Sequence, residues 1–255
     1  MEGFRLQEKT ALLVGPAGRT VQALAQTLTQ LGCDVVLGTD KPETLTRFAA
    51  QLSEACEVNE KFGRAAVARA DVKNKKDAQD LVSKAAEFFG GMDILIDANL
   101  HVSARTFSEG IDELDSICDL NLRSTLLTTH AVLPFLKGRK KGRIFYLLDG
   151  AIQRGVGCDP LAVATRSSLI AFSKSLAAEL SEFQITVNCV EMSLTEEFLL
   201  ATAKEGLTVQ AMLQTHRVRD PRAQITDPDK AAAMVAFLAS QLGSAISGQC
   251  ITVGV

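Results

Sequence analysis

The sequence predicts an α/β fold in which helices cover both faces of a parallel sheet of about seven strands. Short apolar runs alternate with segments of helical periodicity along all 255 residues. This alternation is typical of parallel sheets, because each crossover between parallel strands needs a connection as long as a helix. No linker, repeat or low-complexity segment interrupts it, so the sequence predicts one domain over residues 1–255.

The amino-terminal half contains four predicted strands and three predicted helices. Two of the helices end at glycine, which easily adopts the left-handed backbone that closes a helix. Another helix has proline near its start, where a missing N–H costs nothing. The strands are TALLVG (10–15), CDVVLGT (33–39), GRAAVARADV (63–72) and MDILIDANL (92–100), and the helices are TVQALAQTLTQLG (20–32), PETLTRFAAQLSEACE (42–57) and KDAQDLVSKAAEFFGG (76–91).

The carboxyl-terminal half continues the alternation, with an additional helical segment after its second strand. Ligands of open α/β sheets bind beyond the carboxyl ends of the strands, so we expect the informative residues just after each strand. The predicted strands are GRIFYLLDG (142–150), QITVNCVEM (184–192) and SGQCITVGV (247–255), and the helices are GIDELDSICDLNLRSTLLTTHAVLPFLKG (110–138), DPLAVATRSSLIAFSKSLAAEL (159–180) and DPDKAAAMVAFLAS (227–240).

The composition excludes several classes of function. A net charge of −3 leaves no basic surface of the kind that nucleic acid requires. No apolar run reaches the roughly 18 residues of a membrane span. The start MEGFRLQEKT has no feature of a signal peptide, so we expect a cytoplasmic protein. The six cysteines form no CxxC pair, so we expect buried thiols and no metal site.

Several stretches of the chain resemble the short-chain dehydrogenase/reductase family. MDILID is similar to the strand before that family's Asn-Asn-Ala-Gly motif, DLNLRSTLLTTHAVLPFL to its central helix, and GRIFYLL to the strand that ends in its catalytic serine. SSLIAFSKSLAAELSEFQITVNCV and SGQCITV are similar to its later helix and last two strands. The resemblance implies a Rossmann-type fold, a dimer or tetramer, and hydride transfer between NAD(P) and a carbonyl or alcohol.

The catalytic positions implied by this resemblance lack the residue types that the chemistry needs. The family's Tyr-x-x-x-Lys falls on Ala162 and Arg166, and its serine falls on Asp149. Alanine has no proton to donate, and a carboxylate would repel the oxyanion that serine stabilises. Asn121 matches the family's fourth catalytic position. The single tyrosine, Tyr146, lies inside a strand without a lysine partner, so we expect no catalytic site in this chain.

The glycine-rich loop that holds the dinucleotide in the family is degenerate as well. The pattern Thr-Gly-x-x-x-Gly-x-Gly maps onto VGPAGRTV (14–21), in which only Gly15 keeps its place. Arg19 and Val21 stand at the other two glycine positions, and we expect them to fill the space that the pyrophosphate needs. We expect no cofactor on this chain, although a helix amino terminus still offers N–H groups to an anion. The degenerate loop comprises Gly15, Gly18, Arg19, Thr20 and Val21.

Other cofactor contacts of the family are replaced in the same way. The ribose-binding acid at the end of the second strand falls on Thr39, with Asp40 one residue late. Asp97-Ala98-Asn99-Leu100 replaces Asn-Asn-Ala-Gly, and Met192-Ser193 stands where the family has Pro-Gly. Asp71, which contacts adenine in the family, is retained and would also fit a strand-end cap.

These departures lie on the cofactor and substrate rim, whereas the core periodicity and the helices through which the family assembles are intact. The resemblance therefore implies a catalytically silent subunit that forms a heterotetramer, through the helices at 111–137 and 159–181, with an active homologue that carries NAD. Small residues such as Ala164 and Ala171 permit close helix packing there. The chain resembles the degenerate subunit of a family dehydrogenase that acts on a hydroxyacyl-CoA thioester in anaerobic toluene breakdown.

Two other functions are compatible with the same residues. A repurposed enzyme would use Asp149 as a base kept ionised by Arg166, with Asn121 beside it. A ligand-sensing or scaffold protein would have no dehydrogenase partner. Loss of turnover in Asp149→Asn would indicate the enzyme, and a pull-down from the native host would separate the scaffold from the silent subunit.

Overall fold

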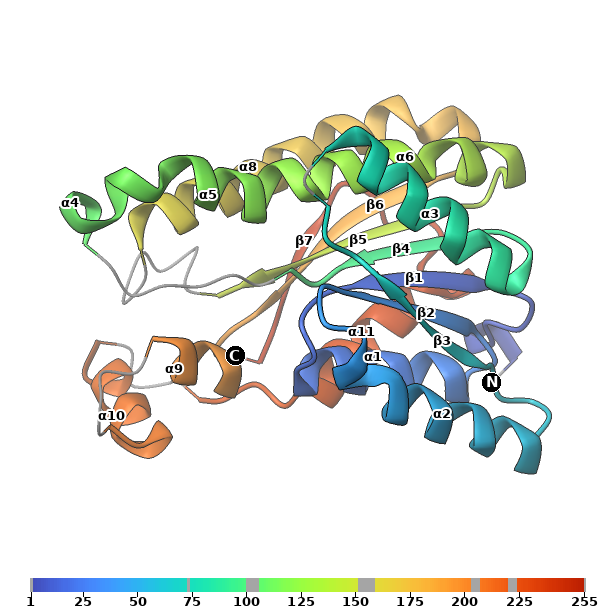
Figure 1. Cartoon of the computed structure of the whole chain (residues 1–255), viewed down its shortest axis with the longest axis horizontal. Coiled ribbons are helices and arrows are strands. Elements are labelled where there is room, and N and C mark those ends of the chain that lie inside the picture. Colours follow the sequence, from blue (N-terminus) through green and yellow to red (C-terminus); the bar gives the residue numbers. More distant parts are fainter. Residues whose placement is uncertain are drawn as a thin grey trace.

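The chain folds around a seven-stranded parallel sheet, as the alternation of strands and helices predicts (Figure 1). The computed structural model describes residues 2–72, 74–99, 106–150, 159–202, 207–219 and 224–254. The strands are β1 (Thr10–Val14), β2 (Asp34–Thr39), β3 (Ala65–Arg69), β4 (Ile94–Asp97), β5 (Arg143–Asp149), β6 (Thr186–Met192) and β7 (Cys250–Val253). Their order in the sheet is β3-β2-β1-β4-β5-β6-β7, and every neighbouring pair is parallel. This is the predicted Rossmann-type arrangement.

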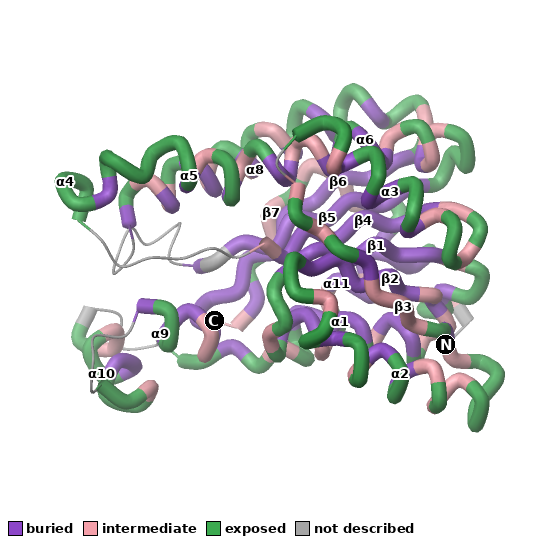
Figure 2. Tube along the Cα trace, in the orientation of Figure 1, coloured by how far each residue is buried: buried purple, intermediate pink, exposed green. Residues whose placement is uncertain are grey.

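Helices cover both faces of the sheet (Figure 1). One layer consists of α1 (Arg19–Gln30), α2 (Glu43–Val58) and α11 (Pro228–Ala239), and the other of α3 (Lys75–Phe89), α6 (Ser124–Arg139) and α8 (Pro160–Glu179). Successive strand residues point to opposite layers, so Leu13 packs in the first core and Leu12 in the second. Figure 2 shows the buried residues concentrated on the strands and on the helix faces that cover them.

Shorter elements lie mainly beyond the carboxyl ends of the strands. The segment formed by α4 and α5 projects past the sheet beside the amino-terminal end of α8, and α9 and α10 lie on the side of the helical layer that contains α1 and α11 (Figure 1). These elements are η1 (Glu2–Phe4), α4 (Phe107–Gly110), η2 (Ile111–Glu113), α5 (Leu114–Cys118), η3 (Asp119–Arg123), η4 (Ser181–Phe183), α9 (Glu196–Ala201), α10 (Val209–Arg219) and η5 (Gln241–Gly243).

The long helix predicted over 110–138 is helical throughout, but its first half is not a regular α-helix. The chain stays helical, but it passes through a 3₁₀ turn at η2 and a π-helical turn at η3 before α6 begins. A π-helical turn widens the backbone locally and changes the direction of the side chains within it. Asn121 lies in this turn, and its side-chain amide nitrogen donates a hydrogen bond to the hydroxyl of Thr165 on α8. No periodicity of apolar residues indicates such a turn.

The helix ends that depend on caps are confirmed. Gly90 closes α3 in the left-handed conformation, with φ of 78°. Asp227 accepts a hydrogen bond from the N–H of Asp229 at 3.1 Å, and Pro228 is the first residue of α11. Asp159 caps α8 by accepting from the N–H of Leu161 at 2.8 Å.

The cysteines are only partly as expected. Cys33 and Cys189 are buried, but the other three described cysteines (Cys56, Cys118 and Cys250) are half-buried, and Cys158 lies outside the described residues. Within the ranges given above, no cluster of His, Cys, Asp or Glu could hold a metal ion. No helix in these ranges is long and apolar enough to span a bilayer.

Candidate nucleotide and catalytic site

A groove of about 580 Å³ lies at the carboxyl ends of β1, β2 and β3. Gly15, Thr39 and Asp71 all line it, so residues that the sequence assigns to one cofactor site do lie together. Asp40 and Asp119 also line the groove, and no lysine or arginine is among the described residues of its wall. Asp119 pairs with Arg123, and the carboxylates of Asp40 and Asp71 leave the described wall acidic, which disfavours a phosphate.

The amino terminus of α1 is covered by a carboxylate from the same chain. The backbone N–H of Thr20 donates to Oε1 of Glu197 at 3.1 Å, and the Thr20 hydroxyl lies 3.4 Å from the same oxygen. Gly18, at the N-cap position, has no side chain to cap the helix itself. A Cβ atom on Gly18 would lie 3.2 Å from Oε1 of Glu197. Glu197 therefore holds the position where a helix amino terminus would otherwise meet an anion.

Arg19 does not fill this space, contrary to the expectation from its place in the loop. Its guanidinium turns outward and pairs with Oε2 of Glu196 at 2.9 Å, with 70% of its side chain exposed. Val21 is buried in the core below the loop, and its Cγ2 lies 3.1 Å from the point that a Cβ on Gly15 would occupy. The group at the expected phosphate position is thus Glu197. It lies 177 residues after Thr20 in the sequence, so no local motif could have identified it.

Glu197→Ala is expected to lower the free energy of unfolding by about 1 kcal/mol, because the start of α1 loses its cap. Glu196→Ala is the matched control, since it also removes an acid from the first turn of α9 but breaks only an exposed ion pair worth less than about 0.5 kcal/mol. Urea unfolding of both variants measures the difference. Equal losses would show that the bond from Thr20 to Glu197 adds nothing.

Ala162 and Arg166 lie one turn apart on the buried face of α8, with exposed fractions of 5% and 4%. Nη1 of Arg166 donates to the carbonyl oxygen of Leu147 at 3.3 Å, and Nη2 donates to Oδ1 of Asn121 at 3.4 Å. The amide nitrogen of Asn121 donates in turn to the hydroxyl of Thr165 at 3.4 Å. The structure therefore brings Arg166 and Asn121 together as predicted, in an interior network.

Asp97, at the end of β4, is a further member of this interior cluster. Its side chain is buried, and its Oδ1 accepts from the N–H of Asn99 at 3.1 Å. Burial raises the pKa of the Asp97 carboxyl, whereas the Asn99 N–H, the positive charge of Arg166 and the hydroxyl of Thr125 lower it. The sequence marks Asp97 as a replaced cofactor residue, and the structure shows it as a buried acid facing a buried cation.

Asp97→Asn is expected to change how stability depends on pH. The folded-state pKa of Asp97 lies above its ordinary value of 3.8, so the folded chain keeps a proton that the unfolded chain has released. Stability contributed by that proton is present at low pH and is lost as the pH rises from 3.8 through the folded pKa. Relative to wild type, the variant should gain stability from acid to neutral pH.

Urea unfolding at a series of pH values measures this gain. Asp80→Asn, on the exposed face of α3, is the matched control and should follow the wild-type curve. A constant difference between Asp97→Asn and wild type at all pH values would refute the assignment.

Tyr146, in the second core, lies beside Asp97, with which it is paired in the register of β4 and β5. Its side chain is fully buried, its hydroxyl lies 2.9 Å from that of Thr129, and burial raises its pKa far above the ordinary value. That it takes no catalytic part stays a prediction. Asp149 is the last residue of β5, but its side chain lies outside the described residues, as does Leu100 of the replaced motif.

Comparison with known proteins identifies relatives over almost the whole chain. A family model described as Enoyl-(Acyl carrier protein) reductase matches residues 21–254. The dehydrogenase/reductase SDR family member 4 of Sus scrofa is 28% identical over 254 residues, which cover 98% of this chain and 87% of that protein. The L-sorbose reductase from Gluconobacter frateurii, solved in complex with NADPH and L-sorbose, has a TM-score of 0.86 at 22% identity and covers 98% of this chain and 97% of its own. A dehydrogenase/reductase from Sinorhizobium meliloti has a TM-score of 0.84 at 23% identity, covering 98% and 95%.

Proposed function

The chain belongs to the short-chain dehydrogenase/reductase family, and from that premise we propose that it is a catalytically silent subunit that assembles with an active, NAD-dependent homologue. The observation that carries the proposal is the carboxylate of Glu197 on the amino terminus of α1. A dinucleotide could bind there only by displacing this carboxylate, and the groove beside it is lined by three further acids. The cofactor of the complex is accordingly assigned to the partner subunit.

The catalytic face supports the same conclusion. Ala162 has no group that can exchange a proton with an alcohol or a carbonyl. Arg166 keeps the positive charge of the lysine it replaces. Its guanidinium donates hydrogen bonds to the Leu147 carbonyl and to Asn121, and its charge lowers the pKa of Asp97. The alternative is a repurposed enzyme that needs Arg166 to hold Asp149 ionised as a catalytic base. A panel of alcohols and carbonyls tested with wild type and Asp149→Asn decides between the two functions.

An exposed apolar stripe on the projecting segment supports assembly with a second chain. Phe107, Ile111 and Leu114 are 57%, 43% and 40% exposed. Their spacing of four and three residues places them on one side of the helical path through α4, η2 and α5. The segment that carries the stripe lies next to the start of α8 (Figure 1). The stripe is therefore close to both helical regions through which we expect assembly, at 111–137 and 159–181. Exposed apolar stripes of this kind mark interaction surfaces.

The narrower form of the proposal concerns the substrate of the complex. The chain resembles the degenerate subunit of 2-(α-hydroxybenzyl)succinyl-CoA dehydrogenase, an enzyme of anaerobic toluene breakdown that consists of two subunits of this family. The active subunit would oxidise the alcohol of a hydroxyacyl-CoA thioester, and this chain would form part of the assembly. The support for this form is the resemblance itself, because no motif of this chain binds a CoA thioester.

Native mass spectrometry of a co-expressed pair tests the proposal. The partner is the homologue with an intact Tyr-x-x-x-Lys, sought first in the reading frame next to the gene of this chain. We expect a heterotetramer in which the number of bound NAD molecules equals the number of active subunits. A homo-oligomer of this chain that ignores the homologue would contradict the proposal.

A further inference from the structure

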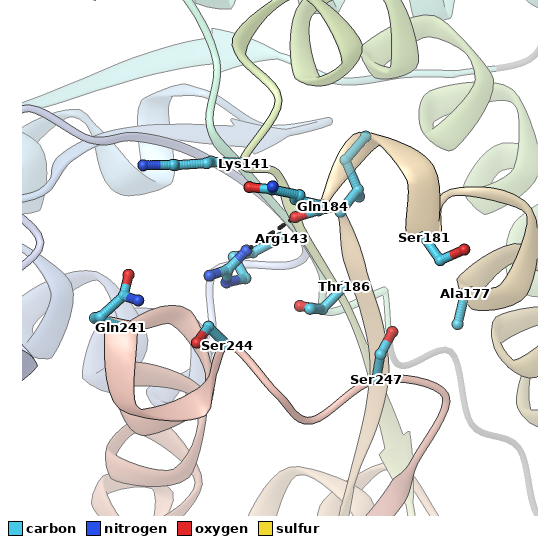
Figure 3. A pocket seen from close by; sticks show the side chains of 10 residues that line it. Lys141, Arg143, Ala177, Ser181, Gln184, Thr186, Gln241, Ser244 and Ser247 are labelled. Carbon is cyan, nitrogen blue, oxygen red and sulfur yellow. Dashed lines mark hydrogen bonds between the residues drawn. The ribbon is translucent and has the colours of Figure 1, made fainter.

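A second pocket, of about 540 Å³, lies at the opposite end of the sheet from the nucleotide groove. Its floor is formed by the amino ends of β5 and β6, where Arg143 is paired with Thr186 in the parallel register. The end of α8, the turn before β6 and the segment around η5 complete the walls (Figure 3). We call it the amino-end pocket; it is lined by Lys141, Arg143, Ala177, Ser181, Gln184, Ile185, Thr186, Gln241, Ser244 and Ser247.

The guanidinium of Arg143 is the unusual feature of the amino-end pocket. Arg143 is 8% exposed, and its Nη1 donates to the carbonyl oxygens of Gly142 and Gln184 at 2.9 and 3.4 Å. Its buried Nε has no hydrogen-bond partner among the described residues, and neither does the hydroxyl of Thr186, which is 6% exposed. Figure 3 shows Arg143 in the middle of the pocket, between Gln184 and Ser244. Two unpartnered donors nine-tenths buried in one cavity are costly unless a ligand satisfies them.

The charges in the pocket all have the same sign. Lys141 and Arg143 are its two ionisable residues, and no aspartate or glutamate is among its described lining residues. Burial lowers the pKa of the Arg143 guanidinium. A buried cation without a counter-ion, surrounded by hydroxyl groups, has the donor chemistry of an oxyanion site.

We propose that the amino-end pocket binds a small oxyanion, either free phosphate or the phosphate group of a small metabolite. Arg143 supplies the buried charge, Lys141 supplies a second charge at the exposed rim, and the hydroxyls of Thr186 and Ser244 supply neutral donors. The volume of about 540 Å³ exceeds that of phosphate alone and lies in the range of small-molecule pockets. The site does not depend on the silent-subunit function, because it lies at the other end of the sheet.

Titration calorimetry with inorganic phosphate and with glycerol 3-phosphate, at constant ionic strength, tests this site. For wild type we expect saturable binding with Kd on the order of 0.1–1 mM. Ser244→Glu places a carboxylate at the exposed wall of the pocket and should weaken binding at least tenfold, because that carboxylate competes for the two cations. Lys141→Gln should weaken it about threefold to tenfold. Both positions are exposed, so these variants test the site without removing the bonds that Arg143 makes to the backbone.

Two surface changes away from the pocket are the matched controls. Gln51→Glu adds the same charge on α2 and Lys84→Gln removes the same charge on α3, and both should leave Kd unchanged. Tighter binding of glycerol 3-phosphate than of phosphate would identify an esterified ligand, and equal binding would identify the free ion. No saturable binding of either anion, or binding that Ser244→Glu leaves unchanged, would overturn the proposal.

Discussion

Arg166→Met is expected to lower the free energy of unfolding by about 2–3 kcal/mol at neutral pH, because it removes a buried cation whose charge favours the ionised form of the buried Asp97. The change also removes both donors that satisfy the Leu147 carbonyl and the Asn121 amide oxygen. In an active member of the family, the residue at this position serves the reaction. Here the same position serves the stability of the interior, so stability is the quantity that should respond.

Arg47→Met is the control for this prediction, because it removes an arginine from the exposed surface of α2. We expect it to change stability by less than about 0.5 kcal/mol. Urea unfolding monitored by circular dichroism compares the two variants. A loss below about 1 kcal/mol for Arg166→Met would mean that the hydrogen bonds and the charge of Arg166 do not stabilise the interior. Such a result would favour the alternative in which Arg166 is part of a catalytic site.

Leu114→Asp is expected to weaken assembly with the active homologue by about 100-fold or more, because it places a charge in the centre of an apolar interface. Leu114 is the third member of the exposed stripe that begins at Phe107. The folded chain itself should be unaffected, since the side chain is already 40% exposed. Analytical ultracentrifugation of the co-expressed pair measures the effect.

Val58→Asp is the matched change for this experiment. Val58 is 89% exposed at the end of α2, on the opposite helical layer, and the substitution adds the same charge to an exposed apolar position. It should leave the assembly intact. Equal loss of assembly in both variants would point to a general effect of charge, and no loss in Leu114→Asp would place the interface elsewhere.

The fold could be predicted from the sequence because its signals are local. Continuous apolar runs such as TALLVG identify buried strands, and Gly90 and Asp227 mark helix ends through their own backbone and side-chain chemistry. The places of Ala162 and Arg166 on one face of α8 follow from helical periodicity. These features need no knowledge of which segments meet in three dimensions.

The features that the sequence did not predict all depend on contacts between distant segments. Glu197 caps α1 although it lies 177 residues away in the sequence. The prediction that Arg19 fills the space at this helix start was wrong, because Glu197 occupies that space and Arg19 pairs with Glu196 instead. The π-helical turn at η3 and the electrostatic effect of Arg166 on Asp97 likewise follow from no periodic pattern in the sequence. The amino-end pocket was not predicted because an arginine at the first position of a strand is usually exposed. Only the structure shows that Arg143 is buried.

A common physical theme connects the degenerate positions. In a binding site, donors and charges stay unsatisfied until the ligand arrives, which costs stability. Here the N–H of Thr20 and the guanidinium of Arg166 have partners within the chain itself. Groups satisfied in this way gain nothing from a dinucleotide. The rim of the sheet therefore contributes to the stability of the fold, which fits the role in assembly that we propose.

Equilibrium titration of the isolated chain with NAD and with NADP tests this account most directly. The account predicts no saturable binding of either dinucleotide up to about 1 mM, which corresponds to a binding free energy weaker than about −4 kcal/mol. The native partner, measured under the same conditions, should bind its cofactor and validate the assay. Saturable binding to the isolated wild-type chain with Kd below about 0.1 mM would contradict the account, because the carboxylate of Glu197 and the cofactor cannot hold the amino terminus of α1 at the same time.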